Sequence, residues 1–523
     1  MFGSRLFPGG VHPHEGKNGK AVNGHNPIAQ LSAPPRVVIP LQQHIGAPAK
    51  ALVKKGDHVK VGQLIGEAGG YVSAPVHASV SGTVVDIQPC VLASGVQSPA
   101  VIIDNDYKEE WVELKPSTHP ETLSAAELQQ IVREAGIVGL GGATFPTAVK
   151  ITPPNGKKIE KLVINGAECE PYLTADHRLM LEKSAEIIDG IRLMMLALDV
   201  KEALVGVEDN KPDAIEALRT AASATEGIEI RALPVRYPQG GEKQLVYALT
   251  RRKVPAGGLP LDVGVVVANV GTVYAIDRAI REGRPLIERV TTVGGLVRKP
   301  GNFLVRIGTP LSALIEAAGG MEDGVKQFLY GGPMMGMAIS RTDIPVTKGC
   351  SGILCLGQEA MEPHESACIR CGRCMRACPM NLAPAKIDAL MRADRYEAAA
   401  AIGAMNCIEC GCCTFVCPAK RSLTQSCRVV KRVVGDRRRK AQAAAKAAQE
   451  GGLSMQKNLA VSSSPHLRDH VSTRRIMQEV CLALAPAGIA GIILFGSQAA
   501  VLIAASVISA VLAEYFYQKL THQ

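Results

Sequence analysis

The sequence predicts a multidomain α/β protein, and three observations lead to this fold class. The chain of 523 residues is long enough for three or more domains of roughly 150 residues each. Hydrophobic residues make up 47% of it and aromatic residues only 4%, with 52 glycines, which is typical of domains packed with aliphatic side chains. In the middle of the chain, apolar runs of strand length alternate with helical segments, the pattern of layered α/β domains.

Residues 1–35 are predicted to be an extended arm, and residues 36–118 a small β domain. The arm has little apolar periodicity. In the β domain, short β-rich runs at Arg36–Pro40, Thr83–Ile87 and Ala100–Asp104 alternate with turns that contain glycine. Short strands at this spacing predict a small barrel or sandwich.

Residues 119–288 are predicted to form a Rossmann-like domain with a mostly parallel sheet. Ligands of such sheets bind at the carboxyl ends of the strands. The region 289–345 has the pattern of a compact ββα insert. In the Rossmann-like domain, helices are expected at 125–135, 185–198 and 212–222, and strands at 161–164 and 203–207.

The stretch Gly139–Lys150 is rich in glycine. Adjacent glycines let backbone amides approach a phosphate or a flat ring, and Lys150 adds a positive charge for a phosphate. By chemistry alone, a ligand-binding loop and an ordinary turn fit this stretch equally well.

Residues 346–430 contain two cysteine quartets with the same spacing, C-x-x-C-x-x-C-x-x-x-C-P. This is the spacing of a bacterial two-cluster ferredoxin, in which the fourth cysteine of each quartet binds the other cluster. A zinc site uses C-x-x-C pairs but needs neither the third cysteine nor the repeated C-P ending. We therefore expect an α-helical ferredoxin-like domain that holds two 4Fe-4S clusters and transfers single electrons. The predicted ligands are Cys368, Cys371, Cys374, Cys378, Cys407, Cys410, Cys413 and Cys417.

Residues 431–465 are predicted to be a basic linker. Nine Lys or Arg residues and only one acid, Asp436, lie between Lys420 and Lys440. Nucleic acid is one partner for such a run, but stacking aromatic residues are absent and a hydrophobic segment follows. We therefore expect contact with a membrane surface and not with nucleic acid.

Residues 466–523 are predicted to form a transmembrane hairpin. Val480–Ala513 are 34 consecutive uncharged residues, which would measure about 51 Å as one helix against a hydrocarbon core of roughly 30 Å. A break at Gly496–Gln498 would divide them into two helices, and a buried pair of helices in a soluble domain is the alternative. Because Arg474 and Arg475 precede this segment, the positive-inside rule places the N-terminal domains at the cytoplasmic face of the membrane.

The β domain resembles biotinyl and lipoyl carrier domains, which are barrel-sandwich hybrids. Val53–Gln63 and Ala74–Val84 carry this resemblance. Carrier domains present a modified lysine at the hairpin tip between these stretches, and Gly69–Tyr71 occupies that place here. The resemblance therefore implies a scaffold module without a swinging prosthetic arm.

Four motifs, in order along the chain, resemble those of the flavin- and NADH-binding subunit of respiratory complex I. They are more similar still to those of the C subunit of the Rnf ion-translocating electron-transport complex. This resemblance covers about residues 5 to 430, including the barrel-sandwich domain, a β-grasp module at the 289–345 insert and both cysteine quartets. The four motifs are Gly139–Lys150, Ile164–Pro171, Tyr237–Lys243 and Val267–Thr272.

The resemblance implies noncovalent FMN on the glycine-rich loop and acidic residues beside the nicotinamide nucleotide. A carboxylate there can accept hydrogen bonds from ribose hydroxyls or from the carboxamide. Two departures are Ala167, where complex I has an acidic residue, and Cys169–Tyr172, which replaces a stretch that contains glycine. The implied FMN and NADH residues are Gly139, Gly141, Gly142, Lys150, Asn165, Glu168, Glu170, Glu242 and Asn269.

The implied function is that of an oxidoreductase subunit that oxidises NADH with FMN and iron–sulfur clusters. It would belong to a complex of the bacterial inner membrane that exchanges electrons between NADH and ferredoxin while translocating Na+ or H+. The implied partners are its A, B, D, E and G subunits and ferredoxin. The cofactors carry this chemistry, so no general acid or base is expected. Two alternatives are a cobalamin reductase of a soluble corrinoid system and a flavin-free electron relay.

Residues from about 455 resemble the beginning of the D subunit, a membrane protein of the same complex. The stretches Met455–Asn458, Ser463–Arg468 and Ser472–Met477 carry this resemblance. The later threonine motif to which that protein attaches flavin is absent. The alternative interpretation is a membrane anchor that belongs to this protein alone and is unrelated to the D subunit.

Overall fold

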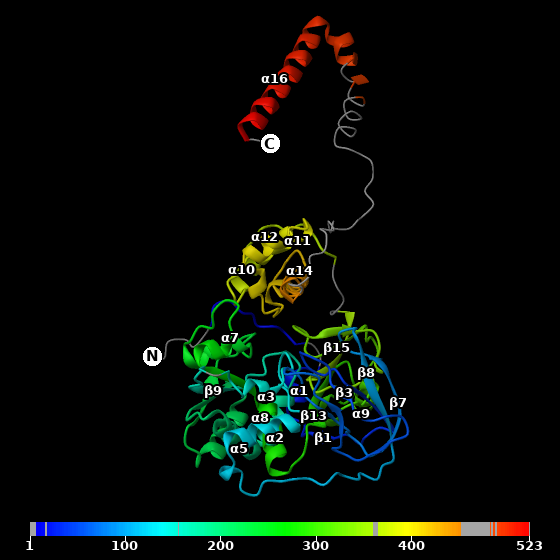
Figure 1. The fold of residues 1–523 in the computed structure, drawn as a ribbon, viewed down its shortest axis with the longest axis vertical. Helices are drawn as coiled ribbons and strands as arrows, with labels where there is room; N and C mark the ends of the chain where they lie inside the picture. Colours follow the sequence, from blue (N-terminus) through cyan, green and yellow to red (C-terminus); the bar gives the residue numbers. More distant parts are fainter. Residues whose placement is uncertain are drawn as a thin grey trace. The chain divides into compact units, whose positions relative to one another are not determined.

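The computed structural model describes residues 7–15, 18–154, 156–358, 364–450, 482, 485–486 and 489–521. The chain divides into two compact units, Met1–Ala443 and Ala444–Gln523, and each is described by itself. The first residues of the predicted arm lie outside the described residues, as do the stretches Met455–Asn458, Ser463–Arg468 and Ser472–Met477 that carry the resemblance to the D subunit. Figure 1 shows the ribbon coloured along the sequence.

The N-terminal β domain consists of two antiparallel sheets, drawn in blue in Figure 1. Val37, Ile39, Ile65 and Ile103 are fully buried in the core, while their neighbours along the strands are more exposed. The predicted small β domain is confirmed. The larger sheet has the order β2 (Arg36–Pro40), β8 (Gln97–Asn105), β7 (Gly82–Val91) and β4 (His58–Val59), and the smaller sheet the order β3 (Lys50–Ala51), β5 (Leu64–Glu67) and β6 (Val76–His77).

The Rossmann-like domain is built on a four-stranded sheet in which every strand is parallel to its neighbours, as predicted. All six residues of the strand at Ala203–Glu208 are buried, which is typical of a central parallel strand covered on both faces. The spatial order is β11 (Ile228–Leu233), β10 (Ala203–Glu208), β9 (Lys161–Gly166) and β12 (Val265–Asn269).

Helices cover both faces of this sheet. One face packs on α7 (Glu242–Thr250), with Val163 and Leu204 against Leu245 and Leu249. The other face packs on α2 (Ala125–Glu134), α4 (Ala175–Glu182), α5 (Ser184–Leu198), α6 (Pro212–Ala222) and α8 (Val270–Arg281). The predicted helices at 125–135, 185–198 and 212–222 are confirmed as α2, α5 and α6. Shorter elements are η1 (Pro120–Thr122), α3 (Thr147–Lys150) and η2 (Pro260–Val263).

The β-grasp insert is a mixed six-stranded sheet with one helix, α9 (Leu311–Ala317), whose Leu311, Leu314 and Ile315 lie in its core. This sheet extends beyond the predicted 289–345. Its spatial order is β1 (Ala29–Gln30), β14 (Gly301–Arg306), β13 (Glu288–Gly295), β17 (Gly352–Leu356), β15 (Gln327–Tyr330) and β16 (Met337–Ile339).

Two of these strands correct the boundaries that the sequence predicts. The predicted arm supplies β1, which pairs with β14, and the predicted cluster domain supplies β17, which pairs with β13 and β15. The arm also contains the short helix α1 (Lys20–Asn23). Local sequence patterns do not reveal such pairings, because the partner strands lie far away along the chain.

The cluster domain is helical, as predicted, and is drawn in yellow to orange in Figure 1. The helical segment between the two quartets is interrupted at Asp394, which takes a left-handed conformation with φ 55°. Gly372 and Gly411, with φ 72° and 81°, take equivalent positions in the two quartets, each just before a helix. The helices are α10 (Arg373–Ala377), α11 (Pro384–Arg392), α12 (Tyr396–Ala401), η4 (Ala404–Asn406), α13 (Cys412–Phe415) and α14 (Leu423–Glu450).

In the second unit, helical residues 489–495 precede α16 (Ser497–Thr521). Gly496 interrupts the helix with φ 74°, so the break predicted at 496–498 is confirmed. Side chains along α16 are exposed, Val501, Leu502 and Val511 among them. Within the described part of the chain, no helix has both the length and the apolar character needed to cross a membrane.

Candidate functional site

The glycine-rich loop lies at the carboxyl edge of the parallel sheet, directly before α3. It closes on itself through the Gly139 amide, which donates to the Phe145 carbonyl at 2.9 Å. The Leu140 amide donates to the Thr272 hydroxyl on α8 at 3.0 Å. A Cβ atom added at Gly142 would meet no atom within 4 Å, so this part of the loop backbone faces open space. The loop is therefore anchored at one end and open to a ligand at the other.

Asn165 and Asn269 lie at the carboxyl ends of the neighbouring strands β9 and β12, where they are directly paired in the sheet. The Asn269 side-chain oxygen Oδ1 accepts from the Gly271 amide at 2.8 Å and caps α8. A Cβ atom at Gly141 would lie 3.0 Å from the Asn269 side-chain nitrogen, a tight contact, so glycine at this position lets the loop lie close to this side chain. Asn165 donates to the Gly240 carbonyl at 2.9 Å. The fold thus brings the glycine loop and both asparagines together.

Lys150 and Glu242 meet at the same edge, although 92 positions separate them in the sequence. The Lys150 Nζ donates to the Glu242 carboxylate at 3.2 Å and to the Val267 carbonyl at 3.0 Å. The side chains of Lys150 and Glu242 are 33% and 41% exposed, so a phosphate could approach the ammonium group. The glycine loop, the asparagines and this lysine form a donor set that fits a flavin phosphate and ring.

Glu168 has a structural contact that the sequence does not reveal. Its carboxylate accepts the backbone amides of Asp176 and His177 at 3.0 and 3.2 Å, at the start of α4. Burial, and then the carboxylate of Asp176, raise the pKa of Glu168 to about 7. The side chain predicted to face the nucleotide is thus engaged at a helix start, and its backbone carbonyl accepts from Lys20.

Glu170 joins two domains. Its carboxylate accepts the Tyr237 hydroxyl at 3.2 Å and the Met334 amide of the β-grasp insert at 3.1 Å. Burial raises the pKa of Glu170 to about 7, although the bonds from Met334 and Tyr237 favour the charged form. Its contacts in this structure therefore position the loop around Tyr237.

Sequence reasoning missed three charged residues under this edge. Lys211 and Glu208 form an ion pair of 2.9 Å, with side chains only 3% and 2% exposed. Asp176 accepts from the Asn269 amide at 2.6 Å, and burial raises the pKa of Asp176. The sequence signal for Glu208 and Lys211 is local: the charged turn Glu208–Lys211 directly follows the apolar residues 203–207.

The cysteines of the two quartets interlock. A cavity in the cluster domain is lined by Cys378 of the first quartet together with Cys407, Cys410 and Cys413 of the second. Cys417 of the second quartet packs with Cys374 of the first. Crossed ligation of two cubes needs this arrangement of the fourth cysteines. Among residues 364–450, and in the rest of the described chain, no group of three or more His, Cys, Asp or Glu side chains is close enough to hold a single metal ion.

Hydrogen-bond donors point at the cavity sulfurs, as they do around ligated thiolates. The Leu382 amide donates to the Cys378 sulfur and the Glu409 amide to the Cys407 sulfur, both at 3.4 Å. The Thr424 hydroxyl lies 3.5 Å from the Cys413 sulfur. Such bonds stabilise the negative charge of cluster ligands and tune the cluster potential. The donor set of this cavity therefore fits an iron–sulfur cube.

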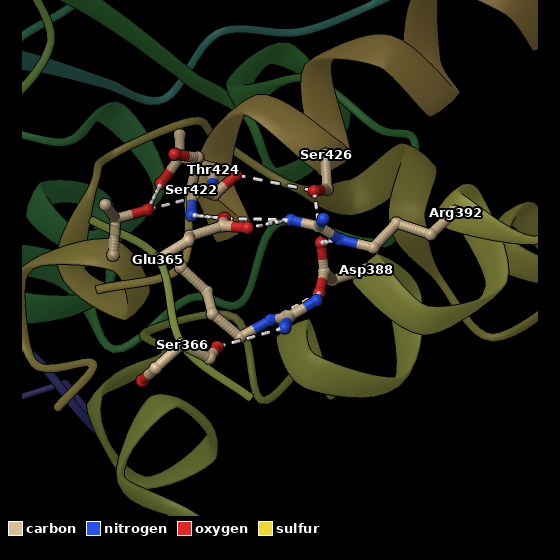
Figure 2. A network of polar contacts seen from close by, with 9 residues as sticks. Glu365, Ser366, Asp388, Arg392, Ser422, Thr424 and Ser426 are labelled. Carbon is tan, nitrogen blue, oxygen red and sulfur yellow. Dashed lines mark hydrogen bonds and ion pairs between the residues drawn. The ribbon is translucent and has the colours of Figure 1, made fainter. Parts of the chain in front are cut away.

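A buried polar network holds the segments that flank the quartets. Figure 2 shows Asp388 on α11 at its centre, bonded to Arg392 and Ser426. Arg421, which follows the second quartet, donates to the same carboxylate at 2.5 and 2.9 Å. Glu365, which precedes the first quartet, accepts from Arg392 at 2.8 Å. The network thus ties both ends of the cluster domain to α11.

The motif Tyr237–Lys243, called the flavin-side loop below, meets the cluster domain at Tyr237, which is 2% exposed. This tyrosine packs with Cys410 and Cys412 and, at the edge of the same apolar cluster, with Cys169. Of the two quartets, the second therefore lies against the flavin-side loop. Cys368 and Cys371 of the first quartet are exposed.

Family models match five consecutive segments of the chain. They are the RnfC barrel sandwich hybrid domain at 5–108, the Nuo51 FMN-binding domain at 132–278, the SLBB domain at 290–338, a 4Fe-4S dicluster domain at 360–444, and the NQR2, RnfD, RnfE family at 460–523.

Several curated proteins are similar over most of the chain. The C subunit of the proton-translocating ferredoxin:NAD(+) oxidoreductase complex of Clostridium ljungdahlii is 49% identical over 76% of this chain and 86% of its own length. The C subunit of the Na(+)-translocating ferredoxin:NAD(+) oxidoreductase complex of Acetobacterium woodii is 45% identical, over 83% of this chain and 98% of its own. An NAD+-reducing [NiFe]-hydrogenase structure, 18% identical over 68% of this chain and 75% of its own, has a TM-score of 0.43, which is too low to carry an argument.

Proposed function

This chain belongs to the family of C subunits of Rnf ion-translocating electron-transport complexes, and from that membership we propose that it is the NADH-oxidising FMN and iron–sulfur subunit of such a complex. It exchanges electrons between NADH and ferredoxin together with the other subunits. When bound, FMN would link the two kinds of electron transfer, because a flavin can take one hydride, which carries two electrons, from NADH and pass the electrons singly to 4Fe-4S clusters, which take one each.

The glycine loop and its neighbours would hold FMN at the carboxyl edge of the sheet. The open backbone at Gly142 leaves room for a flat ring, and Lys150 and the start of α8 supply positive charge for a phosphate. Asn165 and Asn269 would orient the flavin from the ends of their strands. Glu242, at the start of α7, remains the acidic side chain best placed for the nucleotide, since Glu168 and Glu170 already bond backbone amides.

The observation that carries this proposal is the packing of the second quartet on the flavin-side loop. Tyr237 joins the Glu170 carboxylate on one side to Cys410 and Cys412 on the other. A two-electron donor site and a one-electron acceptor site are useful to each other only when they are close, and this contact makes them neighbours. The exposed cysteines Cys368 and Cys371 offer an accessible side for a partner that takes electrons.

The membrane part of the proposal concerns the second unit. We propose that residues 466–523 form a transmembrane hairpin and that the first unit lies at the cytoplasmic face of the bacterial inner membrane. The uncharged stretch Val480–Ala513, the match of 460–523 to the NQR2, RnfD, RnfE family and the preceding arginines support this proposal. Loss of membrane association after deletion of 466–523 would support the anchor, and unchanged association would contradict it.

The test of the electron-transfer function is a spectrum of the full-length protein, purified without oxygen in detergent. Bound flavin should bleach when NADH is added, and the two cluster signals should then appear in electron paramagnetic resonance. Absence of bound flavin, or flavin that NADH does not bleach, would leave only the flavin-free relay. Faster reduction of a corrinoid than of ferredoxin would favour the cobalamin reductase.

A further inference from the structure

The N-terminal arm lies between the flavin-side loop and the second quartet's cavity. In Figure 1 it is the dark-blue trace below the yellow helices. Val11 and Tyr237 form an antiparallel bridge, with the two amides donating to the opposite carbonyls at 2.8 and 2.9 Å. One residue earlier, the Gly10 amide donates to the Ala377 carbonyl at 2.9 Å. Ala377 directly precedes Cys378, so the arm is hydrogen-bonded to the backbone next to a predicted cluster ligand.

Two glycines make this contact possible. Gly9 has φ 73°, and a Cβ atom there would lie 2.7 Å from the carbonyl carbon and oxygen of Cys378. Gly10 has φ 85°, and its Cβ atom would lie 2.7 Å from the Tyr237 carbonyl oxygen. Real Cβ atoms do not approach backbone so closely. The arm backbone therefore touches both partners directly, with no side chain as a spacer.

Apolar packing holds the arm in this position. Phe7 is 3% exposed, and the Arg236 guanidinium lies over its ring at 5.8 Å from the centroid. Val11 packs into the apolar cluster that contains Tyr237 and Cys410. Phe7 and Val11 thus anchor the arm on either side of the two glycines.

We propose that residues 7–11 act as a positioning strap that sets the separation between the flavin-side loop and the cluster bound through Cys378. This inference rests on the proposed function, because the separation matters only if electrons cross it. Each electron that left reduced FMN would reduce one oxidised cluster, and the hydrogen that FMN gained with the hydride would leave as a proton to water when the flavin returns to its oxidised form. Gly9 and Gly10 are positioning residues, since they act through Cys378 and Tyr237.

The test is Gly9→Ala in the full chain, with Gly56→Ala and Gly95→Ala as matched controls. All three glycines have positive φ, but a Cβ atom at Gly56 or Gly95 would meet no atom within 4 Å. Bleaching of the flavin by NADH should keep its wild-type rate in every variant. Cluster reduction that follows should slow roughly tenfold or more in Gly9→Ala alone, because a misplacement of about 1 Å can cost up to ~100-fold in rate.

Hydrogen exchange gives a readout that does not depend on activity. The amides of Val11 and Tyr237 should lose protection in Gly9→Ala and keep it in the controls. Phe7→Ala removes the anchor without touching Cys378, so it should slow cluster reduction while the iron content stays complete. Wild-type cluster reduction in both Gly9→Ala and Phe7→Ala would overturn the strap. A wild-type protein whose flavin NADH does not bleach would instead overturn the proposed function.

Discussion

Replacing Asp388 by asparagine tests whether the buried network of Figure 2 stabilises the cluster domain. The Asp388 side chain is 2% exposed and accepts hydrogen bonds from Arg392, Arg421 and Ser426. Asparagine has nearly the same shape, but it carries no charge and turns one acceptor atom into a donor. That donor would face a guanidinium group in a site with little access to water.

The expected loss in the free energy of unfolding follows from the exposure of the two arginines, Arg392 and Arg421. Removing one partner of a buried ion pair costs about 3–5 kcal/mol. Arg421 is only 14% exposed, but Arg392 is 43% exposed and can be resolvated, so the lower end of about 3 kcal/mol applies. For a domain of this size, a change of about 1 kcal/mol in unfolding free energy shifts the thermal unfolding midpoint by roughly 4–8 °C. The unfolding midpoint of the cluster domain should therefore fall by roughly 12–24 °C.

The assay is thermal release of iron to a chelator from the full-length protein without oxygen, followed by electron paramagnetic resonance. Glu397→Gln is the control, because the Glu397–Arg437 pair is longer, at 3.5 Å, and 62% and 55% exposed. The control should release iron at the wild-type temperature. If Asp388→Asn also did so within about 4 °C, worth less than about 1 kcal/mol, the network would not stabilise the domain.

The pH dependence of this variant has a defined sign. Burial acts to raise the pKa of Asp388, but hydrogen bonds from Ser426, Arg392 and Arg421 outweigh it and lower the pKa. A lowered carboxyl pKa adds stability above the unfolded value of about 3.9, and this contribution is lost as the pH falls through the folded value. The difference between wild type and Asp388→Asn should therefore stay constant between about pH 8 and 5 and shrink only in stronger acid.

Three further changes probe the rest of the chain. Lys211→Met should destabilise the Rossmann-like domain by about 3–5 kcal/mol in denaturant unfolding, because it leaves Glu208 buried without its partner, and an unchanged midpoint would contradict this. Gly190→Ala should lower the free energy of unfolding by at least about 1–3 kcal/mol, because its Cβ atom would lie 2.0 Å from a carbonyl oxygen of α8. The control is Gly435→Ala on α14, which should be neutral or stabilising, because a Cβ atom there meets no neighbour. Cys371→Ser should abolish one cluster signal in electron paramagnetic resonance, and two intact signals would refute the ligand assignment.

Much of the candidate site could be predicted because its signals are local. The turns before α10 and α13 need a left-handed residue at a set distance from the cysteines, and glycine marks both places in the sequence. The alternation of apolar strands and helices likewise predicted the parallel sheet and a ligand site at the carboxyl ends of its strands, whereas Asn165 and Asn269, which meet there, were implied by the family resemblance.

The roles of the acidic residues could not be predicted in the same way. Glu168 and Glu170 follow one strand and belong to one motif, yet one bonds the start of α4 and the other bonds Tyr237 and Met334. Their partners lie between 8 and 164 positions away along the chain. A motif shows which side chains are present but not which donors the fold brings to them.

The order of the domains, the two cysteine quartets and the glycine loop were readable in the sequence, because spacing, periodicity and glycine content depend on neighbouring residues. Only the tertiary structure decided that β17 completes the β-grasp sheet, that the second quartet faces the flavin-side loop and that the arm at Gly9 and Gly10 lies between them. These features depend on backbone contacts between residues hundreds of positions apart, and such contacts exist only once the domains have packed.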